Sequence, residues 1–283
     1  MKSLFLILFS SYFLFSNAQN KPSYLIYDQN GKKASYKDII NSSQKSEVLL
    51  FGEYHDNSVA HWLELEITKD LFGKIVLVLG AEMLESDNQK QVNQYLNGEI
   101  NQKKLDSTAR LWPNYKTDYK PIVDFAKENK IDFIATNIPR RFASLVFKNG
   151  FEALDKLSNE EKQWIATLPF QYDAALPGYS KMAQEMGGHG GENLPKAQAS
   201  KDATMAHFIS KNRKENSLFI HYNGSYHSDN FEGINWYLKQ ENPTLKIVTI
   251  ATVSQNDISK LEPEYFGRAN FIIVIDEDVT KTY

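Results

Sequence analysis

The sequence predicts an α/β protein whose mostly parallel sheet is flanked by helices and which carries a helical insertion or lid. Two observations predict this class. Short apolar runs recur along the chain, as is typical of strands that are buried on both faces. Segments with helical periodicity lie between these runs, an alternation typical of parallel sheets. The runs lie at 48–51, 75–79, 133–135, 218–222, 247–251 and 271–275.

A β-hairpin is expected before the first of these strands. The apolar residues 24–27 and the segment from Lys32 flank the dipeptide Asn30-Gly31. This dipeptide favours the tight turn that joins two antiparallel strands, because both of its residues tolerate positive φ angles. We expect the hairpin to have a structural role.

The first helix is the most clearly predicted one. Four aliphatic side chains recur at every fourth residue and therefore share one helical face. They are Val59, Leu63, Ile67 and Leu71. One of the residues 56–58, all of them good capping residues, is expected to begin the helix, and Gly73 lies just past its end.

The middle of the chain is predicted to be mainly helical. Helical patterns at 88–96 and 121–127 fill the second connection between strands. Residues 139–216 then contain helical patterns, one glycine-rich stretch and no convincing strand. Within them, Ser158 and Glu161 have the spacing of a capping box, which predicts a helix through Ile165. We therefore expect a helical insertion at about 139–216.

Composition limits the possible functions. The chain has 283 residues, of which 42% are hydrophobic and 24% charged, as is ordinary for a globular protein, and we expect one domain over residues 19–283. Lys and Arg number 32 against 35 for Asp and Glu, and no dense basic run occurs, so a nucleic-acid partner is not expected. The sequence has no cysteine, which excludes thiolate metal sites, disulfides and covalently attached haem. Any metal must be held by His, carboxylate or Tyr side chains.

Residues 1–18 have the pattern of a signal peptide. Lys2 precedes an apolar stretch over residues 4–15, and Ser16 and Ala18 occupy the small-residue positions of a cleavage site. A membrane anchor is the alternative, but the stretch is shorter than the roughly 20 residues that a spanning helix needs. A lipid anchor would require a cysteine. We expect an exported protein, periplasmic or secreted, that is soluble after cleavage and carries no lipid anchor.

Polar residues follow four of the predicted strands. Glu53 and His55 follow the first, Glu82 the second, Asn137 and Arg140 the third, and His227 the fourth. Because ligands of parallel sheets bind outside the carboxyl ends of the strands, these residues are candidates for one shared site. Each alone has an ordinary structural explanation, such as bonding to the backbone at a turn.

Glu82 is the most informative of these residues. It follows an almost entirely apolar strand and is expected to be buried, so its carboxylate needs a partner, either Arg140 or His227. His61 lies six residues after His55 and lacks the three- or four-residue spacing of a helical metal pair. The other histidines, His207 and His221, fall within helix and strand patterns and are expected in the core or on the surface.

Several motifs together resemble one known family. The run at 49–57, LLFGEYHDN, is followed in order by Glu82-Met83, Tyr119, Asn137-Ile138-Pro139-Arg140, Gln198, the segment 201–206, KDATMA, and Gly224 with His227. Over about residues 36–230 the chain resembles the ChaN family of haem-binding, iron-regulated proteins, within the Tiki/TraB/erythromycin-esterase-like superfamily. The resemblance implies an α/β body with a smaller helical part, a haem pocket between them and an axial tyrosinate. It also implies a possible homodimer around stacked haems.

The insertion contains a segment that suits haem. Residues 169–191 combine Tyr172, Tyr179 and His189 with apolar residues and glycines. Ferric haem needs an apolar slot, an axial donor, and cationic or amide groups near its propionates. Tyr172 or Tyr179 is the candidate iron ligand, with His189 nearby, and Arg140 and Asn137 are further candidate cofactor-binding residues. An ordinary loop with core aromatic residues is the alternative.

Three functions therefore remain open. The favoured one is an exported haem-binding protein that acts in haem or iron acquisition. The second is a hydrolase in which Glu53, His55, Glu82 and His227 hold a divalent metal or act directly as acid and base on water. The third is a scaffold whose cleft has lost its activity. Fold and motif alone do not decide the chemistry.

Overall fold

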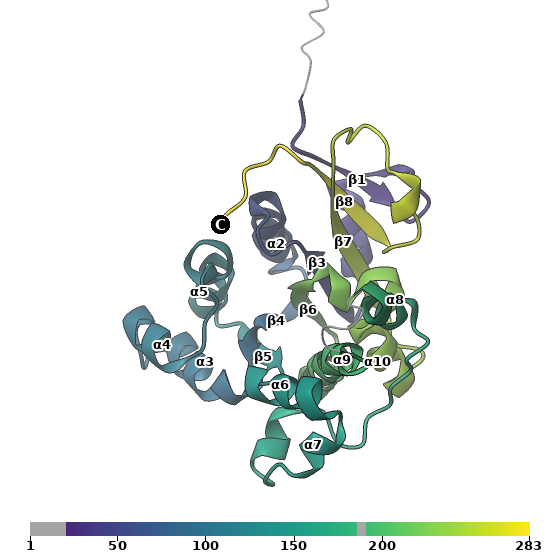
Figure 1. The fold of residues 1–283 in the computed structure, drawn as a ribbon. Coiled ribbons are helices and arrows are strands. Elements are labelled where there is room, and N and C mark those ends of the chain that lie inside the picture. The colour runs from purple at the N-terminus through teal and green to yellow at the C-terminus, as the bar shows by residue number, and fades with distance from the viewer. Residues whose placement is uncertain (1–20, 186–190) are drawn as a thin grey trace, which may run out of the picture.

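The computed structural model describes residues 21–185 and 191–283 and contains one mixed sheet (Figure 1). The strand order is β2-β1-β8-β7-β3-β6-β4-β5, with β1 antiparallel to β2 and β8 and the other pairs parallel. The predicted α/β class with a mostly parallel sheet is confirmed. The strands are β1 (Tyr24–Asp28), β2 (Lys33–Ala34), β3 (Val48–Glu53), β4 (Val76–Glu85), β5 (Asp132–Asn137), β6 (Ser217–Gly224), β7 (Ile247–Gln255) and β8 (Phe271–Asp276).

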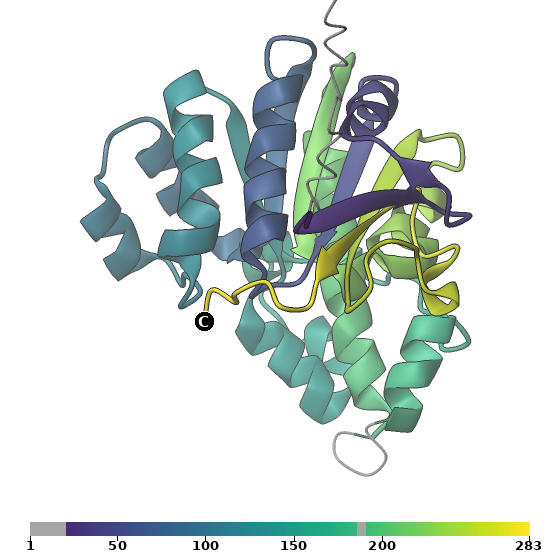
Figure 2. The same ribbon diagram turned by 90° about the horizontal axis from the view of Figure 1, so that it is seen from above.

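Helices cover both faces of the sheet (Figures 1 and 2). On one face lie α1 (Tyr36–Ser43), α2 (Ser58–Leu71), α3 (Gln89–Leu96) and α5 (Lys120–Asn129), with α4 (Gln102–Thr108) beside α3. On the other lie α9 (Asn193–Asn212) and α10 (Ile234–Glu241). The remaining helices, α6 (Arg140–Asn149), α7 (Glu152–Asp155) and α8 (Pro177–Glu185), precede α9 in the chain, and α6 and α8 contact it. The described residues of the 139–216 region are thus helical apart from connecting loops.

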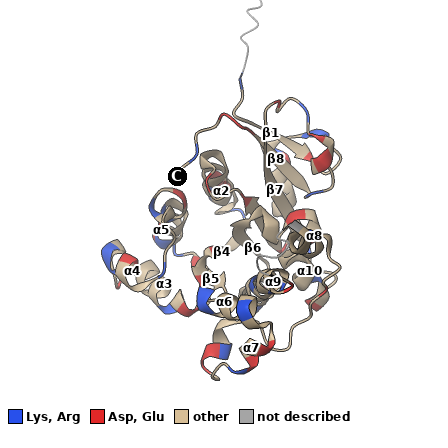
Figure 3. Cartoon of the chain, in the orientation of Figure 1, with Lys and Arg blue, Asp and Glu red and all other residues tan. Residues whose placement is uncertain are grey.

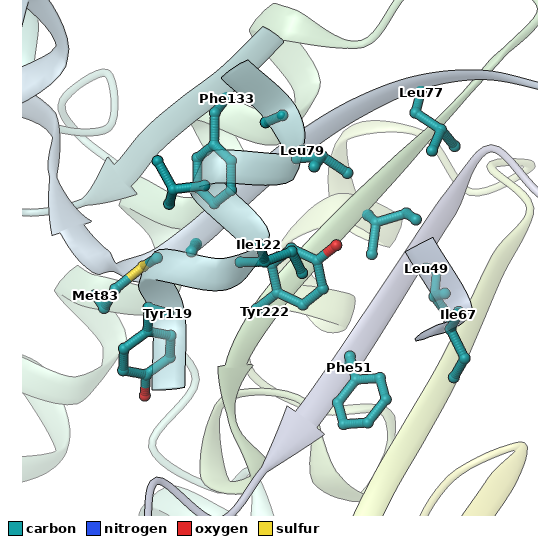
Figure 4. Close-up of a cluster of buried hydrophobic side chains, with 14 of the residues drawn as sticks. Leu49, Phe51, Ile67, Leu77, Leu79, Met83, Tyr119, Ile122, Phe133 and Tyr222 are labelled. Atoms are coloured by element: carbon teal, nitrogen blue, oxygen red, sulfur yellow. The ribbon is translucent and has the colours of Figure 1, made fainter. Parts of the chain in front are cut away.

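The alternation of side chains along β3 explains the two layers. Leu49 and Phe51 join the apolar cluster on the α2 side (Figure 4), whereas Val48 and Leu50 pack toward α9 and α10. Successive residues of a strand point to opposite faces, so a central strand with both faces covered has to be apolar throughout. Tyr119 lies in the α2-side cluster and carries a hydroxyl group (Figure 4).

The capping signals expected for two helices have different outcomes in the structure. Asn57 begins α2, because its side-chain oxygen accepts the amide hydrogens of Val59 and Ala60 at 3.0 Å each. The expected helix from Ser158 is only the 3-10 turn Glu161–Trp164, although the reciprocal capping bonds are present. The prediction that it continues through Ile165 is wrong. Ile165 is extended and buried, and the chain leaves the helical path to pack there.

Charges of both signs are interspersed over the helices (Figure 3). In the described part of the chain, no helix is long and apolar enough to cross a membrane. The predicted signal peptide at 1–18 lies outside the described residues.

Candidate functional site

A cavity of about 690 Å³ lies at the carboxyl edge of the sheet. The ends of β3, β4 and β6 and the helices α8 and α9 contribute to its wall. Four of the six strand-end candidates, Glu53, His55, Glu82 and His227, are among the residues that line it. They come together because β6 pairs in parallel with both β3 and β4, so the three strands end side by side.

Two neighbouring strands end in the same short pattern. β3 leads into Gly52-Glu53-Tyr54-His55 and β6 into Gly224-Ser225-Tyr226-His227. At Gly224, an added Cβ atom would lie 2.8 Å from the His55 ring, closer than real Cβ contacts occur. Glycine therefore lets the His55 ring approach the end of β6, beside the Glu82 carboxylate.

His55 and Glu53 form the first half of the site. The Glu53 Oε1 atom lies 2.7 Å from His55 Nδ1 and accepts a hydrogen bond from the Tyr119 hydroxyl at 2.5 Å. Burial disfavours the charged imidazole, but the carboxylates of Glu53 and Glu82 outweigh burial and raise the pKa of His55. Burial would raise the pKa of Glu53, but the charge of His61 and the hydrogen bonds of His55 and His61 outweigh it and hold that pKa below its usual range.

His227 forms the second half, between two carboxylates. Its Nε2 atom lies 3.1 Å from Glu82 Oε1, and its Nδ1 atom contacts Asp202. Burial would lower the pKa of His227, but Glu82 and Asp202 together raise it to about 9. The second oxygen of Glu82 accepts the Gly224 amide hydrogen at 2.8 Å. Of the two partners expected for Glu82, the structure places His227 against it.

The other predicted cofactor residues of the strand ends lie beside this cavity. Asn137 and exposed Arg140 line a smaller cavity of about 240 Å³, which shares Glu82 and Lys201 with the main one. The Asn137 amide nitrogen donates to the main-chain oxygen of Glu82 at 3.0 Å. Asn137 thus holds the Glu82 backbone in place.

Tyr172 and Tyr179 of the 169–191 segment pack against other protein side chains. The Tyr179 ring is buried and its hydroxyl donates to Asp202 Oδ2 at 2.7 Å. Tyr172 is half-buried, and its ring lies 5.7 Å from the Tyr179 ring and 5.2 Å from Phe151. Neither tyrosine is among the described residues that line the main cavity, whereas Pro177, Gly178 and Met182 of the same segment are. His189 lies outside the described residues.

Sequence reasoning missed four residues of this region. Tyr119 and Asp202 belong to the quoted motifs, and each bonds a site residue, but no role was expected for them. Tyr226 lines the cavity and is 69% exposed. His61 lacks the spacing of a helical metal pair with His55, yet it lies 3.1 Å from Glu53. The i, i+4 spacing of Gln198 and Asp202, which both contact His227, was a signal that could have been read.

The remaining histidines differ from one another. His221 is fully buried in β6 and bonds Thr136 at 2.7 Å and Asn223 at 3.0 Å. Burial lowers its pKa to about 4, so it is neutral, as suits a core histidine. His207 is half-buried on α9 beside Phe208.

Fold and site together define an α/β protein whose cleft, over the carboxyl ends of the parallel strands, contains histidines and carboxylates. The sequence model of the family described as "Haem-binding uptake, Tiki superfamily, ChaN" matches residues 39–238, more than half of the chain. The chain belongs to this ChaN family, which confirms the resemblance of its motifs.

Solved structures share the fold. A structure that describes cofacial haem binding to ChaN of Campylobacter jejuni aligns with a TM-score of 0.67, at 19% identity, over 89% of this chain and 96% of that one. A Bacillus cereus protein aligns with a TM-score of 0.53, at 12% identity, over 89% and 94%. The protein RETICULATA-RELATED 5, chloroplastic, of Arabidopsis thaliana is 28% identical over 100 residues, which are 33% of this chain and 14% of that protein.

Proposed function

We propose that this protein binds haem in the cavity at the carboxyl edge of its sheet. Membership of the haem-binding ChaN family carries the proposal. The cavity volume of about 690 Å³ is in the range of cofactor pockets. Its wall offers apolar contacts from Pro177 and Met182 and the cations Lys201 and Arg268, which suit the ring and the propionates of haem.

Tyr226 is the tyrosine that best suits iron ligation. A phenolate is a hard anionic oxygen donor and favours ferric iron, the metal that haem would supply here. The Tyr179 hydroxyl already bonds Asp202, whereas the Tyr226 side chain lines the cavity and is 69% exposed. Tyr226 also lies in the turn between β6 and His227, so the fold fixes its backbone at the cleft.

Titration with hemin tests this proposal. Wild-type protein is expected to show a saturable change in the absorption spectrum, and Tyr226→Phe is expected to alter that spectrum without altering the folded structure. Tyr172→Phe and Tyr179→Phe are the comparison variants, because these residues are the alternative ligands in the 169–191 segment. If the wild type shows no saturable change, haem binding is refuted. If only one of the comparison variants alters the spectrum, that tyrosine replaces Tyr226.

A haem-dependent homodimer is a further part of the proposal. The Campylobacter jejuni protein is described with cofacial haem, an arrangement in which two haem faces meet. In this chain Tyr226 and Tyr283, both at the cavity, are 69% and 70% exposed, so a bound ring here would be open to a second chain. Sedimentation velocity with and without hemin tests this. A mass that stays monomeric at saturating hemin contradicts it.

We also propose that the protein is exported and acts in haem or iron acquisition. The signal-peptide pattern at 1–18 supports export, and the family description, haem-binding uptake, supports the role. N-terminal sequencing of the exported protein is expected to begin at Gln19. A retained Met1 would contradict export, and unchanged growth of a deletion strain on haem as its iron source would contradict the role.

A hydrolase is the second candidate, because one specific arrangement favours it. His55 and His227 each contact a buried carboxylate at the same cavity, which is a geometry suited to acid–base catalysis or to holding a divalent metal. Hydrolysis of an ester or peptide that is lost in both His55→Gln and His227→Gln would support this function. Equal turnover by wild type and variants would reject it.

A further inference from the structure

A second cluster of chemically active groups lies behind the cleft, between the end of β3 and the first turns of α2. It consists of Glu53, His61 and Glu64, which are 2%, 7% and 1% exposed. One nitrogen or oxygen atom from each lies within 4.8 Å of those of the other two. His61 and Glu64 share a face of α2 because they are three residues apart, and Glu53 reaches them from the strand.

The orientation of the His61 ring is the central observation. Its Nε2 atom lies 3.0 Å from the main-chain oxygen of His55. A carbonyl oxygen can only accept a hydrogen bond, so Nε2 carries the hydrogen. In the neutral ring, Nδ1 would then present a lone pair to Glu53 Oε2 and Glu64 Oε2, each 3.1 Å away. Three electron-rich atoms this close need a cation between them.

A proton on Nδ1 satisfies this cluster only in part. The Nδ1 hydrogen bond goes to Glu64, while Glu53 Oε2 and Glu64 Oε1 are buried without a hydrogen-bond partner among the described residues. Two buried carboxylate oxygens therefore remain available for a cation to contact.

We propose that Glu53, His61 and Glu64 hold a divalent first-row transition-metal ion, Zn²⁺ or Mn²⁺, in a buried site between β3 and α2. Ligands that are 2.0–2.2 Å from one such ion lie about 3.0–3.5 Å from each other. The observed separations of 3.1 Å agree with this spacing. Imidazole with two carboxylates is a donor set that both ions accept.

The surroundings of the cluster support a metal ligand role for His61. Metal-binding histidines usually donate their second ring N–H to a carbonyl or carboxylate, as His61 does to His55. Asp118 Oδ2 lies 3.7 Å from the same Nε2 atom, and it accepts hydrogen bonds from Asn114 and Thr282. Because Glu53 Oε1 faces His55 and Tyr119, an ion on Oε2 would fix the carboxylate that supports the cleft.

Elemental analysis and refolding test this site. Haem-free wild-type protein is unfolded with guanidinium and a chelator and refolded with Zn²⁺, with Mn²⁺, with Mg²⁺ or without metal. We expect about one Zn²⁺ or Mn²⁺ per chain and a higher melting temperature than after metal-free refolding, with no effect of Mg²⁺. We expect the metal content of Glu64→Gln to be lower than that of the wild type by about tenfold or more. We also expect this variant to melt at the same temperature after all four refolding conditions.

Glu64→Gln also distinguishes a bound metal ion from the alternative explanation, a proton shared between His61 and the two carboxylates. Gln imitates a protonated carboxylic acid, so under proton sharing this variant would be as stable as the wild type, and wild-type stability would not depend on metal. That result overturns the site. The double variant His55→Gln/His227→Gln is the control for metal in the cleft, because it leaves His61 and Glu64 unchanged. Metal that disappears in this control but stays in Glu64→Gln also overturns the site. If Glu64→Gln fails to fold, the refolding of the wild type decides alone.

Discussion

We predict that the Tyr179 hydroxyl stabilises the fold and takes no part in haem binding. It donates a 2.7 Å hydrogen bond to Asp202, whose carboxylate is fully buried and also contacts His227. Tyr179→Phe keeps the ring and removes only this donor. A hydrogen bond to a charged group contributes about 1.5–3 kcal/mol, so the free energy of unfolding is expected to fall by about 2 kcal/mol. For a chain of this size that loss lowers the melting temperature by roughly 4–8 °C.

The assay is denaturant and thermal unfolding of the haem-free protein, followed by hemin titration of the same samples. Tyr172→Phe is the matched control, because its ring packs against Tyr179 and Phe151 but no hydrogen bond joins its hydroxyl to a described residue. We expect this control to unfold like the wild type, and both variants to give the wild-type haem spectrum. If Tyr179→Phe is as stable as the wild type, or loses the haem spectrum, the reasoning is refuted.

Three further predictions concern the cleft and α2. The His227 pKa is raised from 6.5 to about 9, so its ion pairs stabilise the fold fully below about pH 6.5, and roughly 3 kcal/mol is lost as the pH rises through 9. Unfolding from pH 6 to 10 should show this loss in the wild type and not in His227→Gln. Gly224→Ala should displace the His55 ring and destabilise the protein by about 1–3 kcal/mol, because the new Cβ atom would lie 2.8 Å from that ring; a crystal structure with an unmoved ring would contradict this. Asn57→Ala should cost about 1 kcal/mol by leaving two amides of α2 without their acceptor, and Asn57→Asp, which keeps an acceptor, should unfold like the wild type.

The sequence was sufficient to predict the strands but not all of their ends. The apolar runs mark the centres of β3 to β8, because burial on both faces demands apolar residues there. The strands then continue past the runs, so that Glu53 and Glu82 lie inside β3 and β4. The apolar pattern stops at these glutamates, although the strand does not. A buried carboxylate that has hydrogen-bond partners is compatible with a strand of the sheet. After Ser158 the prediction is too long instead of too short. The capping bonds form as expected, but the helical turn ends at Trp164 because Ile165 is extended and buried.

The residues of the cleft could be predicted because they depend on one rule, the common edge of parallel strands. Their partners depend on the direction of each side chain, which spacing along the chain does not determine. His61 illustrates this difference: its six-residue separation from His55 excludes a helical pair, yet His55 lies before the helix, and the contact is made by Glu53 on the strand. Tyr179 is the opposite case. The composition of its segment, with glycines and methionines, suits a haem pocket, but in the fold its hydroxyl bonds Asp202. The residue types thus predicted the chemistry of the cleft, and only the register of β3, β6 and α2 decides which atoms face a ligand and which face one another.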